Sequence, residues 1–156
     1  MVLVSWAGFG CGGANDDGGD GGPGGGTPIT EQPLTGKIGG QPFTFATGET
    51  DAFLSMGDRY FVTLYGSAFT ACAVGGAPFS ASSVIFEVPK AAGTYKLGLT
   101  QTATLYDGAV SYNHVATRGS IVIDAIAGTT ISGGASITFD ANNAVNGKFT
   151  ATICAD

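Results

Sequence analysis

Residues 136–153 read SITFDANNAVNGKFTATI and show the clearest strand pattern in the chain. Ile137 and Phe139 alternate with polar residues before the centre of this stretch, and Phe149 and Ile153 alternate with polar residues after it. The central segment, Asp140–Gly147, is rich in Asn and Gly, which tolerate the positive φ angles of tight turns. The pattern predicts an antiparallel hairpin that connects through 140–147 and buries these four apolar side chains.

The same two-residue period continues through most of residues 27–156, interrupted by Gly, Asn, Asp and Pro. Residues 60–65 (YFVTLY) differ because they are apolar on both faces, which predicts a central strand that is covered on each side. No window has the spacing of an amphipathic helix. The chain is therefore predicted to be all-β, an antiparallel β-sandwich or small β-barrel of about 8–10 strands. The segments that support this prediction are 42–45, 82–88, 94–99, 101–106, 110–117 and 120–126.

The composition excludes several classes of function. Charged residues make up 12% of the chain and the formal net charge is −6. An acidic chain of this kind is not expected to bind nucleic acid or anionic lipid through charge. No apolar run approaches the roughly 18 residues of a membrane-spanning helix.

The N-terminal part of the chain differs from the rest. Residues 12–26 consist mainly of Gly and Asp and contain no large apolar side chain, so they cannot bury enough surface to offset the entropy of ordering. We expect a disordered Gly/Asp-rich tether at 12–26 and a β-domain at 27–156.

Residues 1–11, MVLVSWAGFGC, form a short apolar stretch that ends in cysteine just before the tether. This arrangement resembles the end of a bacterial lipoprotein signal, which implies lipidation of Cys11 and a membrane contact made only through the lipid. The alternative is an ordinary hydrophobic N-terminus with an unmodified cysteine.

The other two cysteines, Cys72 and Cys154, then remain as an even pair, and we expect them to form a disulfide in an oxidising compartment. The alternative is three free thiols in a cytosolic protein. The tether and the polar, threonine-rich composition favour the bacterial cell envelope, with a lipid anchor, or secretion.

The sequence offers few groups for catalytic chemistry. His114 is the single histidine and is expected to have a structural role on a sheet. The carboxylate pairs Glu49 with Asp51 and Asp51 with Asp58 are predicted to lie in solvated loops. We therefore expect a protein that is not an enzyme and has no cofactor.

Two segments offer ligand-binding side chains. Tyr106, Asp107 and Tyr112 flank one predicted turn and could bind a glycan, although strand tyrosines more often pack across strands. Asp140, Asn142 and Asn143 supply hard oxygens of the kind that calcium prefers, although Asn is also common in turns.

Three further segments support a family resemblance. Residues 36–43 (GKIGGQPF), 89–95 (PKAAGTY) and 145–151 (VNGKFTA) resemble strand and turn patterns of small bacterial lipoprotein domains. The resemblance implies a cell-surface or periplasmic β-domain with a structural or interaction role. Two alternatives remain: a module that binds a glycan or a small apolar ligand, and a subunit that joins a surface assembly through strand edges.

Deleting residues 12–26 is expected to leave the melting temperature unchanged within error, because the tether has no apolar side chain that could pack on the domain. Thermal denaturation of the full and shortened chains tests this. A loss of several degrees would show that the tether packs against the domain.

Overall fold

The computed structural model describes residues 27–55, 57–78 and 80–155, and it confirms the all-β prediction. The described residues contain no helix, hence none that could cross a membrane. The predictions for 1–11 with Cys11 and for the tether at 12–26 lie outside the described residues. Eleven strands are present: β1 (Thr35–Ile38), β2 (Gln41–Thr44), β3 (Thr47–Thr50), β4 (Arg59–Tyr65), β5 (Ser83–Pro89), β6 (Gly93–Lys96), β7 (Ala103–Asp107), β8 (Tyr112–Ala116), β9 (Arg118–Ala127), β10 (Thr130–Asp140) and β11 (Asn143–Thr152).

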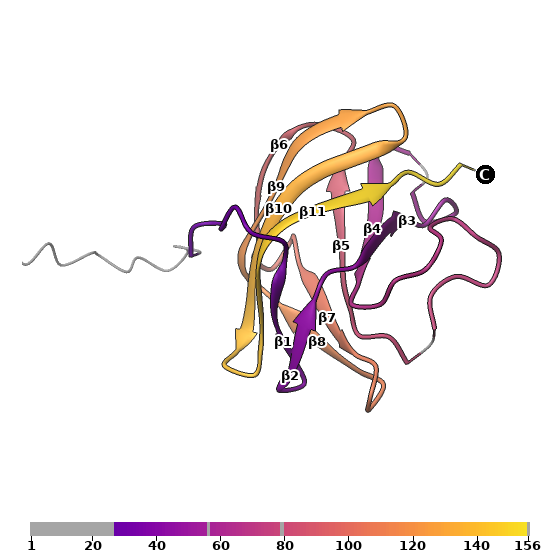
Figure 1. The fold of residues 1–156 in the computed structure, drawn as a ribbon. Coiled ribbons are helices and arrows are strands. Elements are labelled where there is room, and N and C mark those ends of the chain that lie inside the picture. The colour runs from indigo at the N-terminus through magenta and orange to yellow at the C-terminus, as the bar shows by residue number, and fades with distance from the viewer. Residues whose placement is uncertain (1–26, 56, 79, 156) are drawn as a thin grey trace, which may run out of the picture.

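The strands form one curled open sheet, a half-barrel, rather than two stacked sheets (Figure 1). The main path runs β6-β9-β10-β11-β3-β4-β5-β7-β8, and β1 with β2 branches from β11. Neighbouring strands are antiparallel except β11 and β3, which pair in parallel at Thr152 and Glu49. One end strand of the path, β8, leads directly into β9, the second strand from the other end, since β8 ends at Ala116 and β9 begins at Arg118.

The core fills the inner side of this curled sheet, because alternate residues of each strand point inward. On β4, Val62 and Leu64 are buried, and their partners on β5, Phe86 and Val84, are buried as well. The isoleucines of β9 and β10 face them from the other part of the sheet. The largest fully buried apolar side chains are Leu34, Ile38, Leu64, Leu105, Ile121, Ile123, Ile131, Ile137, Val62, Val84 and Val88.

The predicted terminal hairpin is present as β10 and β11, but its turn is shorter than expected. Only residues 141 and 142 separate the two strands, so the segment from Asn143 to Gly147 belongs to β11. Ile137 and Phe149 are buried and Ile153 packs partly against the core, as predicted.

The prediction that Phe139 faces the core is wrong, because 40% of its surface is exposed. The pairing of β10 with β11 shifts register between Thr138 and Asp140, at the end of the hairpin. There the ring of Phe139 lies against His114, with 5.3 Å between the ring centroids. The alternation of apolar and polar residues therefore extends to Phe139, whereas the enclosed core ends at Ile137.

The chain that leads into β1 crosses β11 at Gly147. The amide of Leu34 donates to the carbonyl of Lys148, and the amide of Lys148 donates to the carbonyl of Gln32. Gly147 has a φ of 141°, and a Cβ atom there would lie 2.6 Å from the carbonyl oxygens of Gln32 and Pro33. This close approach of two backbones requires glycine.

Gly147→Ala is therefore expected to lower the free energy of unfolding by about 1–3 kcal/mol more than Gly128→Ala. Gly128 is a matched control because it also has a positive φ, 56°, but has no atom within 4 Å of a Cβ built on it. Denaturant unfolding of both variants measures the difference. Equal losses of unfolding free energy in the two variants would show that residues 32–34 move away from the added Cβ atom at no energetic cost.

Candidate functional site

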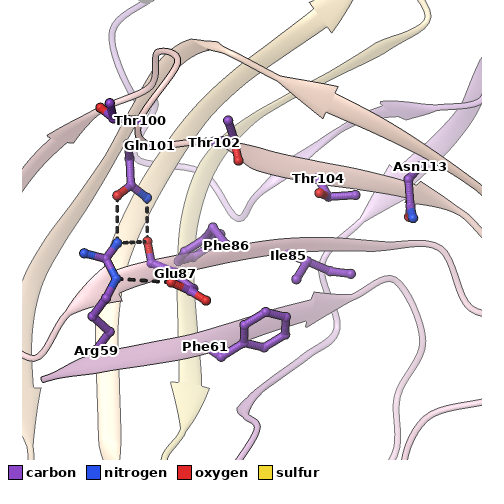
Figure 2. A pocket seen from close by; sticks show the side chains of 10 residues that line it. All are labelled: Arg59, Phe61, Ile85, Phe86, Glu87, Thr100, Gln101, Thr102, Thr104 and Asn113. Atoms are coloured by element: carbon purple, nitrogen blue, oxygen red, sulfur yellow. Dashed lines mark hydrogen bonds and ion pairs between the residues drawn. The ribbon is translucent and has the colours of Figure 1, made fainter. Parts of the chain in front are cut away.

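A hollow of about 470 Å³ lies on the outer face of the sheet, over β4, β5, β7 and β8 (Figure 2). Since Val62 and Leu64 point into the core, Phe61, which directly precedes Val62, points outward. Ile85 on β5 and Thr104 on β7 are register partners and share this outer face. Phe61 and Ile85 are half-buried, so the hollow presents apolar surface outside the core.

The sequence predicted cover on both faces of 60–65, and the outer face is covered at one end only. The ring of Tyr65 packs edge-on against Phe69 in the segment that follows β4, with 5.0 Å between centroids. Thr63 is buried beside it. Phe61 at the other end borders the hollow.

One end of the hollow is ordered by a network of charged and amide groups. Arg59 Nε lies 3.2 Å from Glu87 Oε2, and a terminal nitrogen of Arg59 donates to Gln101 Oε1 at 2.8 Å. The Gln101 amide donates in turn to the backbone carbonyl of Glu87, as does the guanidinium (Figure 2). A surface ion pair of this kind adds little stability. Its effect is to position three side chains and to neutralise the guanidinium.

Uncharged polar groups line the rest of the hollow. Thr100, Thr102 and Thr104 lie along one side, and Asn113 on β8 lies at the end opposite Arg59 (Figure 2). Hydroxyl and amide groups both donate and accept hydrogen bonds. Among the described residues that line the hollow, Glu87 is the one carboxylate, so the pair of carboxylates that glycoside hydrolysis uses is not present in it.

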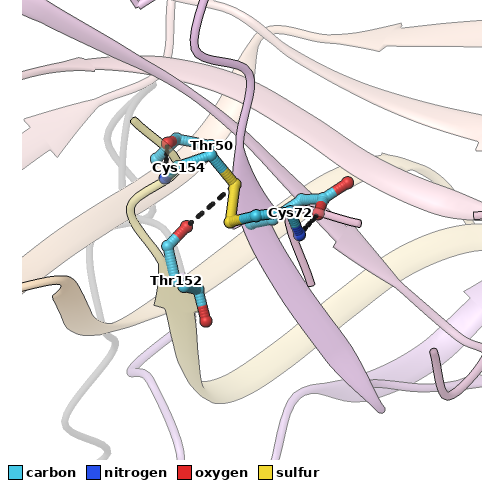
Figure 3. Close-up of a disulfide and its surroundings, with 5 residues drawn as sticks. Thr50, Cys72, Thr152 and Cys154 are labelled. Atoms are coloured by element: carbon cyan, nitrogen blue, oxygen red, sulfur yellow. Dashed lines mark hydrogen bonds between the residues drawn. A yellow bond between two sulfur atoms is a disulfide. The ribbon is translucent and has the colours of Figure 1, made fainter. Parts of the chain in front are cut away.

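The predicted disulfide is present and joins Cys72 to Cys154, whose Cα atoms are 5.4 Å apart (Figure 3). Cys72 lies in the irregular segment after β4, in a loop rather than just behind a strand. Its amide donates to Glu49 Oε2 at 2.6 Å, and the amide of Cys154 donates to Thr50 Oγ1 at 3.0 Å. Both cysteines are thus held on β3. The bond fixes the segment after β4 and the C-terminal segment to the same strand.

Glu49 and the two sulfur atoms lie within 4.8 Å of one another. Metal binding by cysteine requires thiolates, and these sulfur atoms are bonded to each other. Burial and then the negative charge of Glu49 raise the pKa of the nearby Tyr65 hydroxyl. Glu49 lies on strand β3 and not in the predicted loop, whereas Asp51 lies in a turn and accepts a hydrogen bond from the amide of Leu54.

The structure divides the residues predicted to bind a glycan, Tyr106, Asp107 and Tyr112, between the two faces of the sheet, so the three side chains do not form one surface. Tyr106 pairs with Asn113 on the outer face, whereas Tyr112 pairs with Asp107 on the opposite face. Asp107 is buried and accepts a hydrogen bond from the amide of Ala109. Successive strand residues point to opposite sides, which sequence proximity at a turn conceals.

His114 has surroundings that fit the structural role predicted for it. Its ring lies between those of Tyr112 and Phe139, at centroid separations of 4.9 Å and 5.3 Å. It faces Leu105 across the β7–β8 pair, on the inner side of the sheet.

The residues that were predicted to bind calcium make hydrogen bonds within the terminal hairpin. Asp140 Oδ1 accepts hydrogen bonds from the amide of Asn142 and from Asn143 Nδ2, and these bonds lower the pKa of Asp140. Asn143 is buried, and its Oδ1 accepts from the amide of Gly39 in the β1–β2 turn. Asp140 Oδ1 and Asn143 Oδ1 are thus engaged in hydrogen bonds within the β10–β11 turn and between it and the β1–β2 turn.

No protein-family model, no curated protein and no solved structure matches this chain. Sequence reasoning missed Arg59, Phe61 and Ile85 as site residues. The apolar character of both faces at 60–65 is the signal that could have found Phe61.

Proposed function

We propose that this chain is a non-catalytic interaction domain of the bacterial cell envelope, anchored by a lipid on Cys11 or secreted, that presents the outer-face hollow to a binding partner. The Cys72–Cys154 disulfide supports an oxidising compartment, because such bonds persist there and are rare in the cytosol. The resemblance of residues 1–11 to a lipoprotein signal supports the anchor.

One observation carries the interaction role: Phe61 and Ile85 face outward in a hollow that extends over four strands, and they remain partly exposed beside an ordered polar network. Concave surfaces that combine apolar contact area with a few placed polar groups are typical of binding sites. The alternative of assembly through strand edges has less support. The end strands β6 and β8 are four and five residues long, and short edges pair poorly with other chains.

Co-sedimentation with isolated envelope material tests the interaction role. The purified full chain is expected to pellet with insoluble envelope fractions, and Phe61→Ala is expected to reduce the bound amount. Phe139→Ala is the matched control, because Phe139 is an exposed aromatic residue outside the hollow. Failure to pellet, or equal loss in both variants, would contradict an interaction role for the hollow.

Cell fractionation tests the anchor separately. The chain is expected in the membrane fraction, and Cys11→Ser is expected to release it into the soluble envelope fraction or the medium. Unchanged membrane association after this substitution would contradict lipidation, and a cytosolic location would contradict the whole proposal.

A further inference from the structure

We propose that the outer-face hollow binds an uncharged carbohydrate chain. This inference rests on the proposed function, because it assigns a ligand class to the same surface. It concerns Phe61, Ile85 and the threonines beside them, and it does not use the tyrosines that the sequence pointed to.

The charges of the hollow argue for an uncharged ligand. Arg59 is the one cation among the described residues that line it, and its guanidinium is already paired with Glu87 and with the side-chain oxygen of Gln101. An anionic ligand would compete with Glu87 for this guanidinium, and a cationic ligand would compete with Arg59 for the carboxylate. Breaking either contact costs free energy that an uncharged ligand does not lose.

The remaining groups match the chemistry of a sugar. A pyranose ring has apolar C–H faces and a rim of hydroxyl groups. Phe61 and Ile85 supply adjoining apolar surface, since Ile85 lies on the strand next to β4. Thr102, Thr104 and Asn113 supply hydroxyl and amide groups that donate and accept, as sugar hydroxyls do.

The shape of the hollow favours a chain over a single small molecule. It is a surface depression that extends over four neighbouring strands, from Arg59 on β4 to Asn113 on β8. Strands lie about 4.8 Å apart, so three steps span roughly 14 Å. This length accommodates several linked sugar residues, and the open face lets the chain continue beyond the site.

Titration of the isotope-labelled full chain with uncharged oligosaccharides tests the assignment. The probes are hexasaccharides of β-1,4-linked glucose, α-1,4-linked glucose and β-1,4-linked N-acetylglucosamine, together with an apolar peptide as a non-sugar probe. At least one sugar is expected to shift amide resonances at 59–61, 85–87 and 100–104. The affinity is expected to change little with added salt, because no charge is neutralised on binding.

Substitutions inside and outside the hollow test whether the sugar binds there. Phe61→Ala is expected to weaken sugar binding by about tenfold or more, since aromatic contacts dominate such surfaces. Thr104→Val keeps the shape and strand preference and removes the hydroxyl, so it should weaken binding without unfolding the domain. Phe139→Ala should bind as the unaltered chain does.

Three outcomes would overturn the assignment: no shift with any of these sugars, shifts confined to other surfaces, or binding that Thr104→Val and Phe61→Ala leave unchanged. Shifts in the hollow with the peptide and not with the sugars would also reject carbohydrate. Binding of the peptide alone would reject carbohydrate as the ligand but would keep the interaction role of the hollow. Failure to co-sediment with envelope material would contradict the interaction role itself.

Discussion

Replacing Cys72 and Cys154 with serine is expected to lower the free energy of unfolding by up to about 4.5 kcal/mol. The disulfide spans 82 residues, and a cross-link over a loop of that length removes much of the entropy of the unfolded chain. A domain is ordinarily stable by only about 5–15 kcal/mol, so this loss removes a large share of the total.

Denaturant unfolding of the double variant, Cys72→Ser with Cys154→Ser, measures the effect against the oxidised chain. Both are made in a Cys11→Ser background to prevent mispairing. Reductant should destabilise the chain that retains the pair and should not affect the double variant. A loss below about 1 kcal/mol would contradict the entropic account.

Phe149→Ala is expected to cost about 3–5 kcal/mol. Only 4% of Phe149 is exposed, and its ring packs edge-on against Phe86 across the curled sheet, with 5.6 Å between centroids. Truncation leaves a cavity between β11 and β5 that the surrounding backbone cannot close.

The adjacent Lys148→Ala is the control for this prediction. Its ammonium group lies on the outer face, 3.1 Å from Asp124 and 3.6 Å from Glu31, and exposed pairs contribute little. Denaturant unfolding should therefore show a small loss for Lys148→Ala and a large one for Phe149→Ala. Similar losses would mean that β11 has the opposite face toward the core.

Much of the fold follows from local patterns in the sequence. Alternation and turn residues predicted the β10–β11 hairpin and the inward side chains of Ile137 and Phe149. Cysteine parity predicted the disulfide without showing where Cys72 lies. Phe139 was predicted wrongly, because alternation reports which face a residue takes and not where the enclosed core ends.

The candidate site was harder to predict because it depends on strand order. Phe61, Ile85 and Thr104 lie on β4, β5 and β7, and only the register of the sheet brings them side by side. Arg59 and Gln101 are 42 positions apart in the chain. The tyrosines at 106 and 112 are close in sequence, and the pleat of the strands turns them to opposite faces.

The segment after β4 and the hollow cover different parts of the outer face of β4, at Tyr65 and at Phe61. The covalent bond holds the segment after β4 on β3, where Phe69 packs on Tyr65. Phe61 at the other end borders the hollow and is half-buried. This arrangement explains how an outward apolar strand can be partly covered and partly available for binding.

Thiol trapping in intact native cells tests most directly whether this domain works in an oxidising compartment. Cells are treated with a membrane-permeant maleimide before lysis, and the peptides that contain Cys72 and Cys154 are examined by mass spectrometry before and after reduction. We predict that both cysteines are unlabelled and linked to each other until a reductant is added. Labelling of both thiols before any reductant is added would contradict a location in an oxidising compartment.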